Sequence, residues 1–232
     1  FTVTPGDGYE IADVLVDGKS VGAVDSYTFE KVRANHTIAA SFQAEGQRPV
    51  WNPFADVKEG AWYYDSVKDI YERGLMNGTG KTTFSPELAT TRGMIVTILW
   101  RLEQEPESGA AMSFTDVTAG SYCFDAVRWA AEHEIVKGYT ATAFGPADTI
   151  TRQELAAILY RYARYKGADV SAADDLAAFT DRPDGWAEAA VKWAVGVGVL
   201  SGKGSGVLDP KGRATRAEVA AMLHRFLSNT AN

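Results

Sequence analysis

The sequence predicts a mainly helical fold in which three similar units share one core, preceded by a small β module. Two observations support this prediction. The composition changes near residues 43–53, and from Phe54 onward one pattern of residues occurs three times at fixed offsets. With 232 residues, 46% of them hydrophobic, the chain is long enough to bury a sizeable core.

The first 42 residues have the composition of short β-strands, with frequent Val, Thr, Ile, Tyr and Phe between turn residues. Strands are predicted at 1–4, 9–16, 27–29 and 37–42, and Asp17-Gly18 is a strong hairpin signal. Such a module (1–42) is only marginally stable alone. Because the chain begins at Phe1 within a predicted strand, we expect it to be a fragment of a longer protein. Residues 43–53, with one glycine and two prolines, are predicted to be a linker.

The repeats share several positions. Each opens with Phe-x-Asp, continues with an aromatic residue, a glycine and a Phe/Leu-x-Pro loop, and ends its pattern with a Thr-Arg pair. The pairs are Thr91-Arg92, Thr151-Arg152 and Thr215-Arg216, each arginine standing fourteen residues after the glycine. This number of coincidences indicates a real internal repeat, with predicted units 54–107, 108–170 and 171–232.

Each unit is predicted to have two amphipathic helices. Apolar residues recur with helical spacing after Val67, Val127 and Val191 in the first helices, and after Ile95, Leu155 and Val219 in the second. A single unit could not bury these one-sided helices, whereas three copies can share one core. We therefore predict a helical bundle with approximate threefold symmetry.

The second helix of each unit is predicted to begin after its threonine, which would act as the N-cap. Glu154 and Glu218 stand three residues after their threonines and complete a capping box, a structural role that accounts for both residues. Unit 1 has Gly93 and Met94 in the first turn instead, so we expect its helix start to be the loosest of the three.

The arginine after each threonine is predicted to contact a ligand. Arg92, Arg152 and Arg216 would stand at the first helical position, where the helix dipole disfavours a cation by a few tenths to about 1 kcal/mol. Beside free helical N–H groups, such an arginine could hold a carboxylate or a phosphate. The alternative is structural: an ion pair with the Phe-x-Asp aspartate or with a neighbouring unit, or packing of the aliphatic stem.

Aromatic and acidic residues near the first helices are further candidates. Sugars stack on rings such as those of Trp62, Tyr122 and Trp186, although aromatic residues at helix entries more often belong to the core. The aspartates of the Phe-x-Asp motif are expected to act as caps or turn formers, and nothing nearby supplies a nucleophile or a distinct second acid. These aspartates are Asp56, Asp116 and Asp181.

The composition argues against several classes of function. A formal charge of −7 disfavours non-specific binding to nucleic acid or to anionic membranes. No apolar run approaches the roughly 18 residues of a membrane span. The single cysteine, Cys123, excludes an internal disulfide framework, and three scattered histidines make a metal site improbable. No cofactor is implied.

The combined motifs resemble those of surface-layer homology (SLH) domains. The likeness covers about 54–227 and lies in the Phe-x-Asp opening, the Gly–Phe–Pro loop and the T-R-x-E helix start, TRQE at 151–154 and TRAE at 215–218. It implies a pseudo-threefold arrangement of a central three-helix bundle and outer helices. It also implies non-covalent anchoring of an exported bacterial protein to the cell wall, through a secondary wall polysaccharide that often has a pyruvyl ketal.

The resemblance further implies carbohydrate-binding grooves between adjacent units, in which the T-R-x-E arginines help to hold the acidic sugar. The residues implied are Arg92, Arg152, Arg216, Trp62, Tyr122, Trp186, Asp56, Asp116, Asp181, Gly78, Gly138, Gly202, Glu154 and Glu218. Met94 departs from the motif, so the competence of the groove of unit 1 stays open.

Residues 1–42 are similar to the divergent internalin-type β-repeats that often precede SLH units in Gram-positive surface proteins. The likeness lies in Gly8-Tyr9-Glu10-Ile11, in residues 14–19, in Tyr27-Thr28-Phe29 and in His36-Thr37-Ile38. It implies a spacer or adhesin module, truncated at its start.

The expected function is a non-catalytic, monomeric wall anchor at the surface of a Gram-positive-type bacterium. One alternative is a self-assembly module, such as a lattice subunit. The other is a hydrolase of wall sugars, which needs two carboxyl groups about 5–5.5 Å apart if it retains configuration. Equivalent aspartates spread around a threefold axis disfavour such a site.

Overall fold

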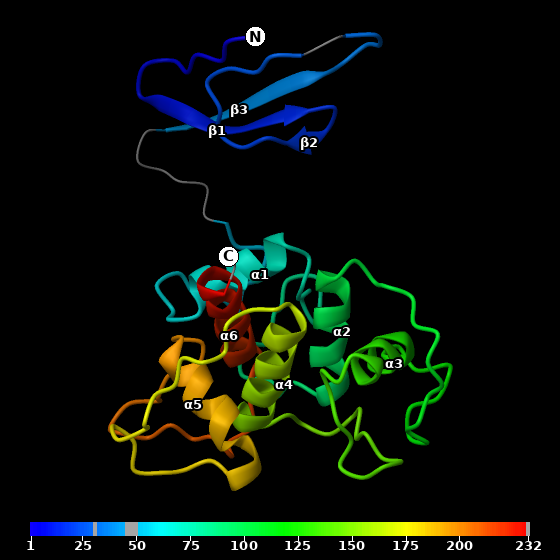
Figure 1. The fold of residues 1–232 in the computed structure, drawn as a ribbon. Helices are drawn as coiled ribbons and strands as arrows, with labels where there is room; N and C mark the ends of the chain where they lie inside the picture. Colours follow the sequence, from blue (N-terminus) through cyan, green and yellow to red (C-terminus); the bar gives the residue numbers. More distant parts are fainter. Residues whose placement is uncertain (30–31, 45–50, 231–232) are drawn as a thin grey trace. The chain divides into compact units, whose positions relative to one another are not determined.

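The chain divides into two units, Phe1–Asn52 and Pro53–Asn232, in the computed structural model (Figure 1). The structure describes residues 1–29, 32–44 and 51–230. The predicted linker falls mostly outside the described residues. Its first two residues, Gln43 and Ala44, instead complete strand β3.

The first unit contains a three-stranded sheet of β1 (Tyr9–Val16), β2 (Lys19–Ser20) and β3 (Ile38–Ala44), in the order β2-β1-β3 with antiparallel pairs. The Asp17-Gly18 hairpin is confirmed, with both residues at positive φ as a type I′ turn requires.

The prediction of strands at 1–4 and 27–29 is wrong. Thr2 forms only an isolated bridge with Ser26, the residue before the second segment, and the pairing does not extend into a ladder. Their apolar alternation lasts only a few residues, and Pro5 follows the first segment with no N–H group to donate.

The second unit contains two α-helices per repeat in its described part, as predicted. They are α1 (Tyr64–Glu72), α2 (Arg92–Leu102), α3 (Phe124–Glu132), α4 (Arg152–Tyr165), α5 (Glu188–Gly196) and α6 (Arg216–Asn229), with a 3-10 turn, η1 (Gly185–Ala187), before α5. None of the described helices combines the length and the apolar character that crossing a membrane requires.

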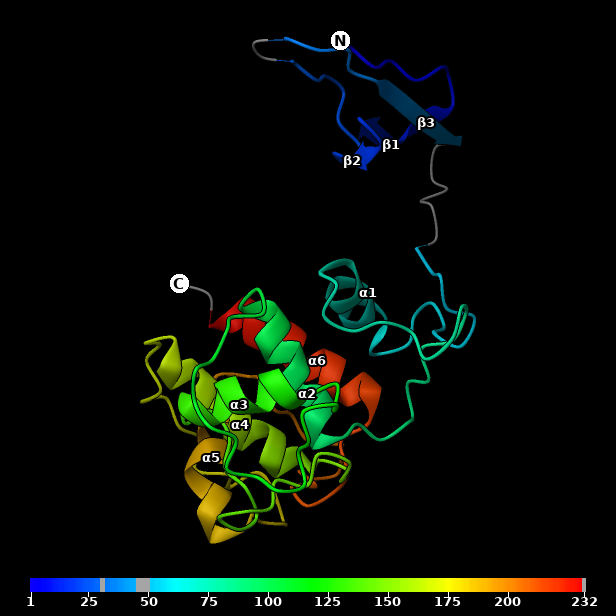
Figure 2. The ribbon, with the colours of Figure 1, turned by 90° about the vertical axis from the view of Figure 1, so that its right-hand side faces the viewer.

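The second helices of the repeats form the centre, and the first helices lie outside them (Figures 1 and 2). Each outer helix packs against the inner helix of the preceding repeat in cyclic order: α3 against α2, α5 against α4, and α1 against α6. The last contact joins the two ends of the unit, and His224 of α6 lies 2.8 Å from Asp69 of α1. The predicted mainly helical, pseudo-threefold bundle is confirmed.

Three equivalent residues close a ring of hydrogen bonds where the repeats meet. The N–H of Thr90 donates to the carbonyl of Ala214, that of Ala214 to Ile150, and that of Ile150 to Thr90, at 2.9–3.0 Å. All three residues are fully buried. Because buried backbone groups need partners, each repeat depends on both of the others at this point.

Each outer helix ends before the last residue of its apolar pattern. The last apolar residue of each pattern, Leu75, Ile135 or Val199, is buried in the turn after the helix. In the first repeat the reason is Gly74 at φ +71°, whose N–H bonds to the Tyr71 carbonyl while Leu75 N–H bonds to Ile70. This pairing is a Schellman motif, which ends a helix.

The glycine of each repeat is required by close packing. A Cβ on Gly138 would lie 2.5 Å from the ring of Phe114 and 2.5 Å from two carbonyl oxygens, and Gly78 and Gly202 are equally confined by Phe54 and Phe179. The phenylalanine of the Phe-x-Asp motif therefore packs directly on the loop that precedes the inner helix.

We expect Gly138→Ala to lower the free energy of unfolding by about 1–3 kcal/mol, because the added methyl group has no space. Urea unfolding followed by circular dichroism would measure the loss. Gly120→Ala is the matched control, since a Cβ there meets nothing within 4 Å, and its effect should stay within about 0.5 kcal/mol. Equal effects from the two substitutions would contradict the packing argument.

Candidate functional site

Three equivalent arginines lie at the junctions between repeats. Arg92, Arg152 and Arg216 are only 5%, 4% and 8% exposed. Nε of Arg92 donates to the Phe144 carbonyl at 3.0 Å and Nη2 to the Lys137 carbonyl at 2.8 Å, both in the following repeat. The equivalent bonds join Arg152 to Leu208 and Ser201, and Arg216 to Phe84 and Asn77. Each guanidinium therefore fastens one repeat to the loop of the next.

The expectation of free N–H groups at these helix starts is wrong. The N–H groups of Arg92 and Gly93 donate to the carbonyls of Asp148 and Pro146, at 3.0 Å each. Carbonyls of the next loop accept from the other two helix starts in the same way. The loop carbonyls occupy the site that was expected to receive an anion, and they also offset the unfavourable position of the arginine in the helix dipole.

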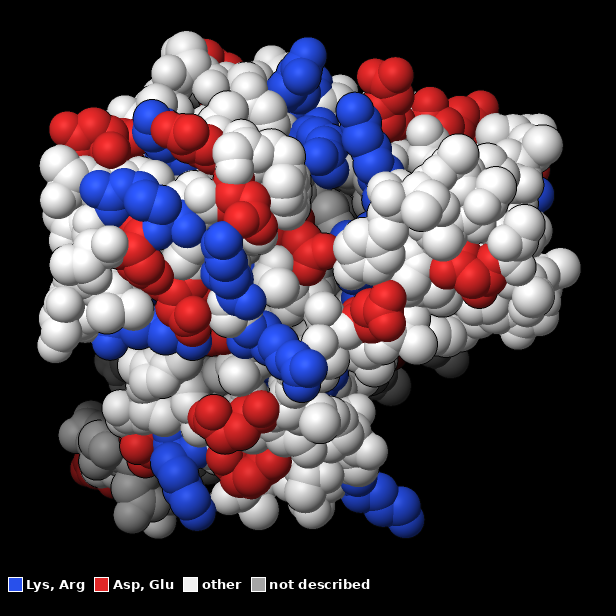
Figure 3. Space-filling view, turned by 90° about the horizontal axis from the view of Figure 1, so that it is seen from below, with Lys and Arg blue, Asp and Glu red and all other residues white. Residues whose placement is uncertain are grey.

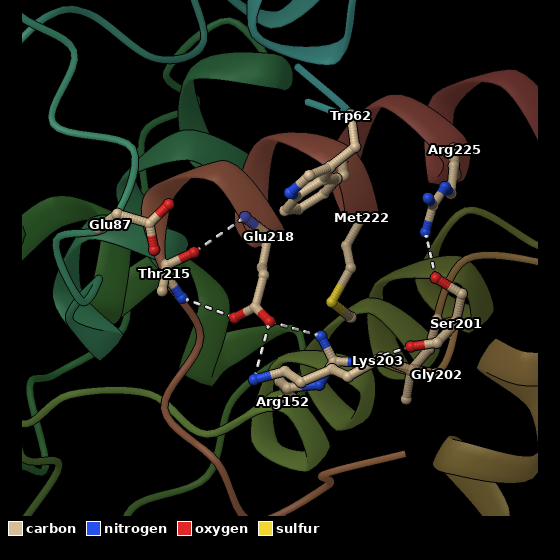
Figure 4. A pocket seen from close by; sticks show the side chains of 12 residues that line it. Trp62, Glu87, Arg152, Ser201, Gly202, Lys203, Thr215, Glu218, Met222 and Arg225 are labelled. Carbon is tan, nitrogen blue, oxygen red and sulfur yellow. Dashed lines mark hydrogen bonds and ion pairs between the residues drawn. The ribbon is translucent and has the colours of Figure 1, made fainter. Parts of the chain in front are cut away.

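The glutamates have two roles at once. Glu154 uses Oε2 to complete the predicted capping box with Thr151, and Oε1 to accept from Nη1 of Arg92 at 3.3 Å and from the Tyr139 hydroxyl at 3.1 Å. Glu218 caps α6 in the same way, and its Oε1 lies 3.0 Å from Nη1 of Arg152 and 3.1 Å from Nζ of Lys203 (Figure 4). The capping boxes are confirmed, and Arg92 and Arg152 form the ion pairs with a neighbouring unit that the sequence left as the alternative.

The third junction lacks this carboxylate. Met94 occupies the position of the glutamates, and Thr91 accepts only the single cap bond from Met94 N–H, at 3.4 Å. The Arg216 guanidinium lies 4.4 Å from the centre of the Phe84 ring, and its Nη1 has no partner among the described residues. Burial lowers the pKa of Arg216, an effect that Asp56 only partly opposes.

The aspartates of the Phe-x-Asp motif do not cap helices. Asp181 accepts from the N–H groups of Leu208 and Asp209 at 2.8 and 2.7 Å, and the other two bind the equivalent loop residues. The expectation of a helix cap is corrected here: the partners are 27–29 residues away in sequence, in the loop before the inner helix. The backbone bond from Leu208 is the main reason that the pKa of Asp181 is lowered.

The aromatic residues before the outer helices are not part of the core. Trp62, Tyr122 and Trp186 are 63%, 62% and 58% exposed. The Tyr122 hydroxyl lies 3.4 Å from that of Thr91, at the start of α2. The structure thus contradicts the core alternative and leaves three large rings open to solvent.

Two of these rings line pockets between repeats. We call groove 1–2 the pocket of about 460 Å³ that includes Arg92, Tyr139, Glu154, Arg161 and Trp186. Groove 2–3 is the pocket of about 520 Å³ that includes Arg152, Lys203, Glu218, Arg225 and Trp62 (Figure 4).

Every repeat contributes to each groove. The arginine comes from one repeat, the loop and inner helix from the next, and the tryptophan from the third. Gly138 and Gly202 also line these grooves, and Gly78 occupies the equivalent position of the first repeat. Both volumes are in the range of small-ligand sites.

The sequence contained one further signal that the motif analysis missed. Arg161 and Arg225 line the grooves, and each stands nine residues after its Thr-Arg arginine, as Arg101 does in the first repeat. The apolar spacing that defines the helices does not include this charged position of the repeat.

A model of the S-layer homology domain matches residues 53–93, 113–156 and 178–220, together more than half of the chain. The chain belongs to the SLH family. The SLH repeats make the second unit an anchoring module of the bacterial cell surface. The family model does not cover the first unit, whose similarity to β-repeats remains a prediction.

Several known proteins are similar to this chain over most of its length. An endoglucanase of a Bacillus species is 30% identical over 182 residues, which is 78% of this chain and 19% of that protein. The surface-layer 125 kDa protein of Lysinibacillus sphaericus is 31% identical over 173 residues, 71% of this chain and 14% of that protein. The cellulosome-anchoring protein of Acetivibrio thermocellus is 26% identical over 148 residues, 62% and 33% of the two chains. The SLH chain thus spans a third or less of each of these relatives.

We expect Met94→Glu to raise the free energy of unfolding by about 1 kcal/mol, because it completes the capping box of α2 and gives Arg216 a carboxylate partner. Chemical denaturation would measure the gain. Met94→Gln can form the cap bond without the charge, so it should gain less. Equal gains from both variants would show that Arg216 does not contribute.

The lowered pKa of Asp181 predicts a loss of stability in acid. A carboxyl whose pKa falls on folding stabilises the protein above its unfolded pKa of about 4, and this contribution disappears as the pH falls through the folded pKa. Asp181→Asn should therefore be less stable than the wild type by about 1–3 kcal/mol at pH 7, and the difference should shrink below about pH 4. Urea unfolding at pH 7, 5 and 3 would test this, and a difference independent of pH would contradict it.

Proposed function

We propose that this SLH module anchors its protein by binding an acidic secondary wall polysaccharide, with pyruvylated sugars, in the grooves between repeats. The observation that supports this most directly is the pairing of an exposed tryptophan with a cationic pocket in groove 1–2 and again in groove 2–3. Eight of the fourteen residues nominated from the sequence line these two grooves: Arg92, Gly138, Glu154, Trp186, Arg152, Gly202, Glu218 and Trp62. Asp116 and Asp181 bind the loops beside the grooves, whereas Arg216, Tyr122, Asp56 and Gly78 line neither groove.

Exposed tryptophans at equivalent positions fit a sugar ligand. A tryptophan more than half exposed leaves a large apolar face in water, and a flat apolar face beside polar groups is what a pyranose ring requires. The polar groups in groove 2–3 include Lys203, Glu218 and Arg225, which can exchange hydrogen bonds with sugar hydroxyls (Figure 4).

Local charge, rather than the charge of the whole protein, would attract an acidic polymer. The chain has a formal charge of −7, and acidic and basic side chains alternate on the face shown in Figure 3. Groove 1–2 is different, because Arg92, Lys137 and Arg161 outnumber Glu154 there. Recognition of the acidic sugar would therefore depend on the grooves.

Several grooves on one body would also strengthen attachment. Individual sites with one aromatic ring and a few polar contacts are expected to be weak, but simultaneous binding along one polymer adds avidity without new contacts. The repeats are joined by hydrogen bonds at every junction, so the grooves keep fixed spacings. A monomeric module with an internal pseudo-trimer would suffice.

The relatives support a non-catalytic role for this region. An endoglucanase and an amylopullulanase match 78% and 77% of this chain over only 19% and 10% of their own lengths, while a surface-layer protein and a cellulosome-anchoring protein match 71% and 62% of it. A part shared by enzymes and anchoring proteins is better explained as an anchor than as a catalytic site. The whole protein could still include an enzyme.

The two alternative functions, self-assembly and hydrolysis of wall sugars, are not equally supported. The similarity to a surface-layer protein favours self-assembly as the second candidate. The hydrolase alternative loses support, since each aspartate of the Phe-x-Asp motif already accepts two backbone bonds.

We expect Trp186→Ala and Trp62→Ala each to weaken binding to a purified pyruvylated wall polysaccharide by about 3–10-fold, because each removes one stacking surface. Titration calorimetry of the full chain would measure this. The exposed rings contribute little to the core, so the variants should fold normally. Tyr9→Ala, which removes an exposed ring of the first unit, is the control and should bind like the wild type.

The same titration separates the alternatives. Equal binding of the polymer before and after removal of its ketals would keep the anchor and remove the acidic sugar from the proposal. A folded wild-type chain that binds neither polymer but forms concentration-dependent assemblies in sedimentation experiments would favour the lattice subunit.

A further inference from the structure

We propose that Arg161 holds the carboxylate of the acidic sugar and that groove 1–2 is consequently the strongest binding site of the module. This inference rests on the proposed function and names the residue and the groove on which it depends. It differs from the expectation from the sequence motif, in which the Thr-Arg arginines have that role.

The Thr-Arg arginine of this groove is already fully engaged. Arg92 uses Nε and Nη2 for carbonyls of the next repeat and Nη1 for Glu154. The ring of Tyr139 also covers its guanidinium, 4.4 Å away. A ligand carboxylate would have to displace Oε1 of Glu154 from Arg92, while the capping box of α4 holds this glutamate in place through Oε2.

The side chain of Arg161, by contrast, is available to bind a ligand. It lies on α4 two and a half turns after Arg152, lines groove 1–2 and is only partly exposed. Its side chain forms no hydrogen bond or ion pair within the described structure. Burial, together with the nearby charge of Arg92, lowers its pKa. A bound carboxylate would compensate this isolated cation and could accept two parallel hydrogen bonds from it.

The equivalent arginines are not free in the same way. Nη1 of Arg225 donates to the Ser201 hydroxyl at 2.9 Å. Arg101 is 3.9 Å from Glu105, and its side chain is 44% exposed. Of the three equivalent arginines, only Arg161 is therefore without a polar partner in the described structure.

The surrounding charges reinforce this difference. Groove 2–3 includes two carboxylates, Glu87 and Glu218, and its Lys203 is paired with Glu218 and with Asp209. Groove 1–2 includes only Glu154 against three cations. An anionic group should therefore enter groove 1–2 more favourably, with Trp186 on the same pocket to contact the sugar ring.

Calorimetry with a short pyruvylated fragment of wall polysaccharide tests the assignment, because a monovalent ligand avoids avidity. We expect Arg161→Gln to weaken binding by about tenfold or more, since a charge-assisted contact is lost. The same fragment without its ketal should bind wild type and variant equally. Arg164→Gln, an exposed arginine one turn further on α4, is the matched control and should bind as the wild type does. Arg161→Lys keeps the charge without the paired donors and should give an intermediate loss.

The outcomes distinguish this inference from the proposed function. A folded wild-type chain that fails to bind the pyruvylated fragment and the polymer would refute the proposed function itself. Wild-type binding that Arg161→Gln and Arg161→Lys leave unchanged would overturn the role of Arg161 while keeping the anchor. Equal losses from Arg161→Gln and Arg225→Gln would overturn the ranking of the grooves. Thermal unfolding of each variant would confirm that the binding changes are not caused by unfolding.

Discussion

The start of each inner helix is hydrogen-bonded to the loop of the next repeat, and the rest of the SLH fold depends on this junction. The first N–H groups of the helix and the buried arginine beside them all donate to carbonyls of that loop. The aspartate of the Phe-x-Asp motif fixes the same loop from behind, and the confined glycine lets the phenylalanine pack against it. Three junctions in cyclic order leave no repeat with a complete core of its own.

The grooves follow from this arrangement. Because the Thr-Arg arginine is buried by its own junction, it forms the floor of the groove rather than its exposed wall. Residues 139, 161 and 186 surround that floor in groove 1–2. The residue at position 139 differs among the repeats, since its equivalents are Thr79 and Lys203. Position 161 is arginine in every repeat, but the polar partners of that arginine differ. The shared scaffold is therefore symmetric, whereas the chemistry offered to a ligand is not.

The sequence was sufficient to predict the fold class but not the pairing of its helices. Fixed offsets and apolar spacing identify the repeats and their helices, because burial of one helix face leaves a periodic pattern. The same pattern would suit packing within a repeat, so it could not show that α3 packs on α2 of the preceding repeat. Motif spacing likewise located Arg92, Arg152 and Arg216, but the acceptors that occupy them belong to a different repeat. The side chain of Arg161 has no hydrogen-bond or ion-pair partner in the described structure. A sequence pattern cannot show this, because it does not show which side chains meet in the fold.

The contact between α1 and α6 has a consequence for how the chain acquires its structure. Asp69 and His224 meet although they are 155 residues apart, and the first repeat finds part of its core only in the last. A nascent or translocating chain would therefore remain incomplete until its third repeat had emerged, and apolar faces of the first two would stay uncovered during that interval. This late closure would aid export of the chain in an unfolded state. The stable bundle, which could hinder passage of the chain during export, forms only after the third repeat has emerged.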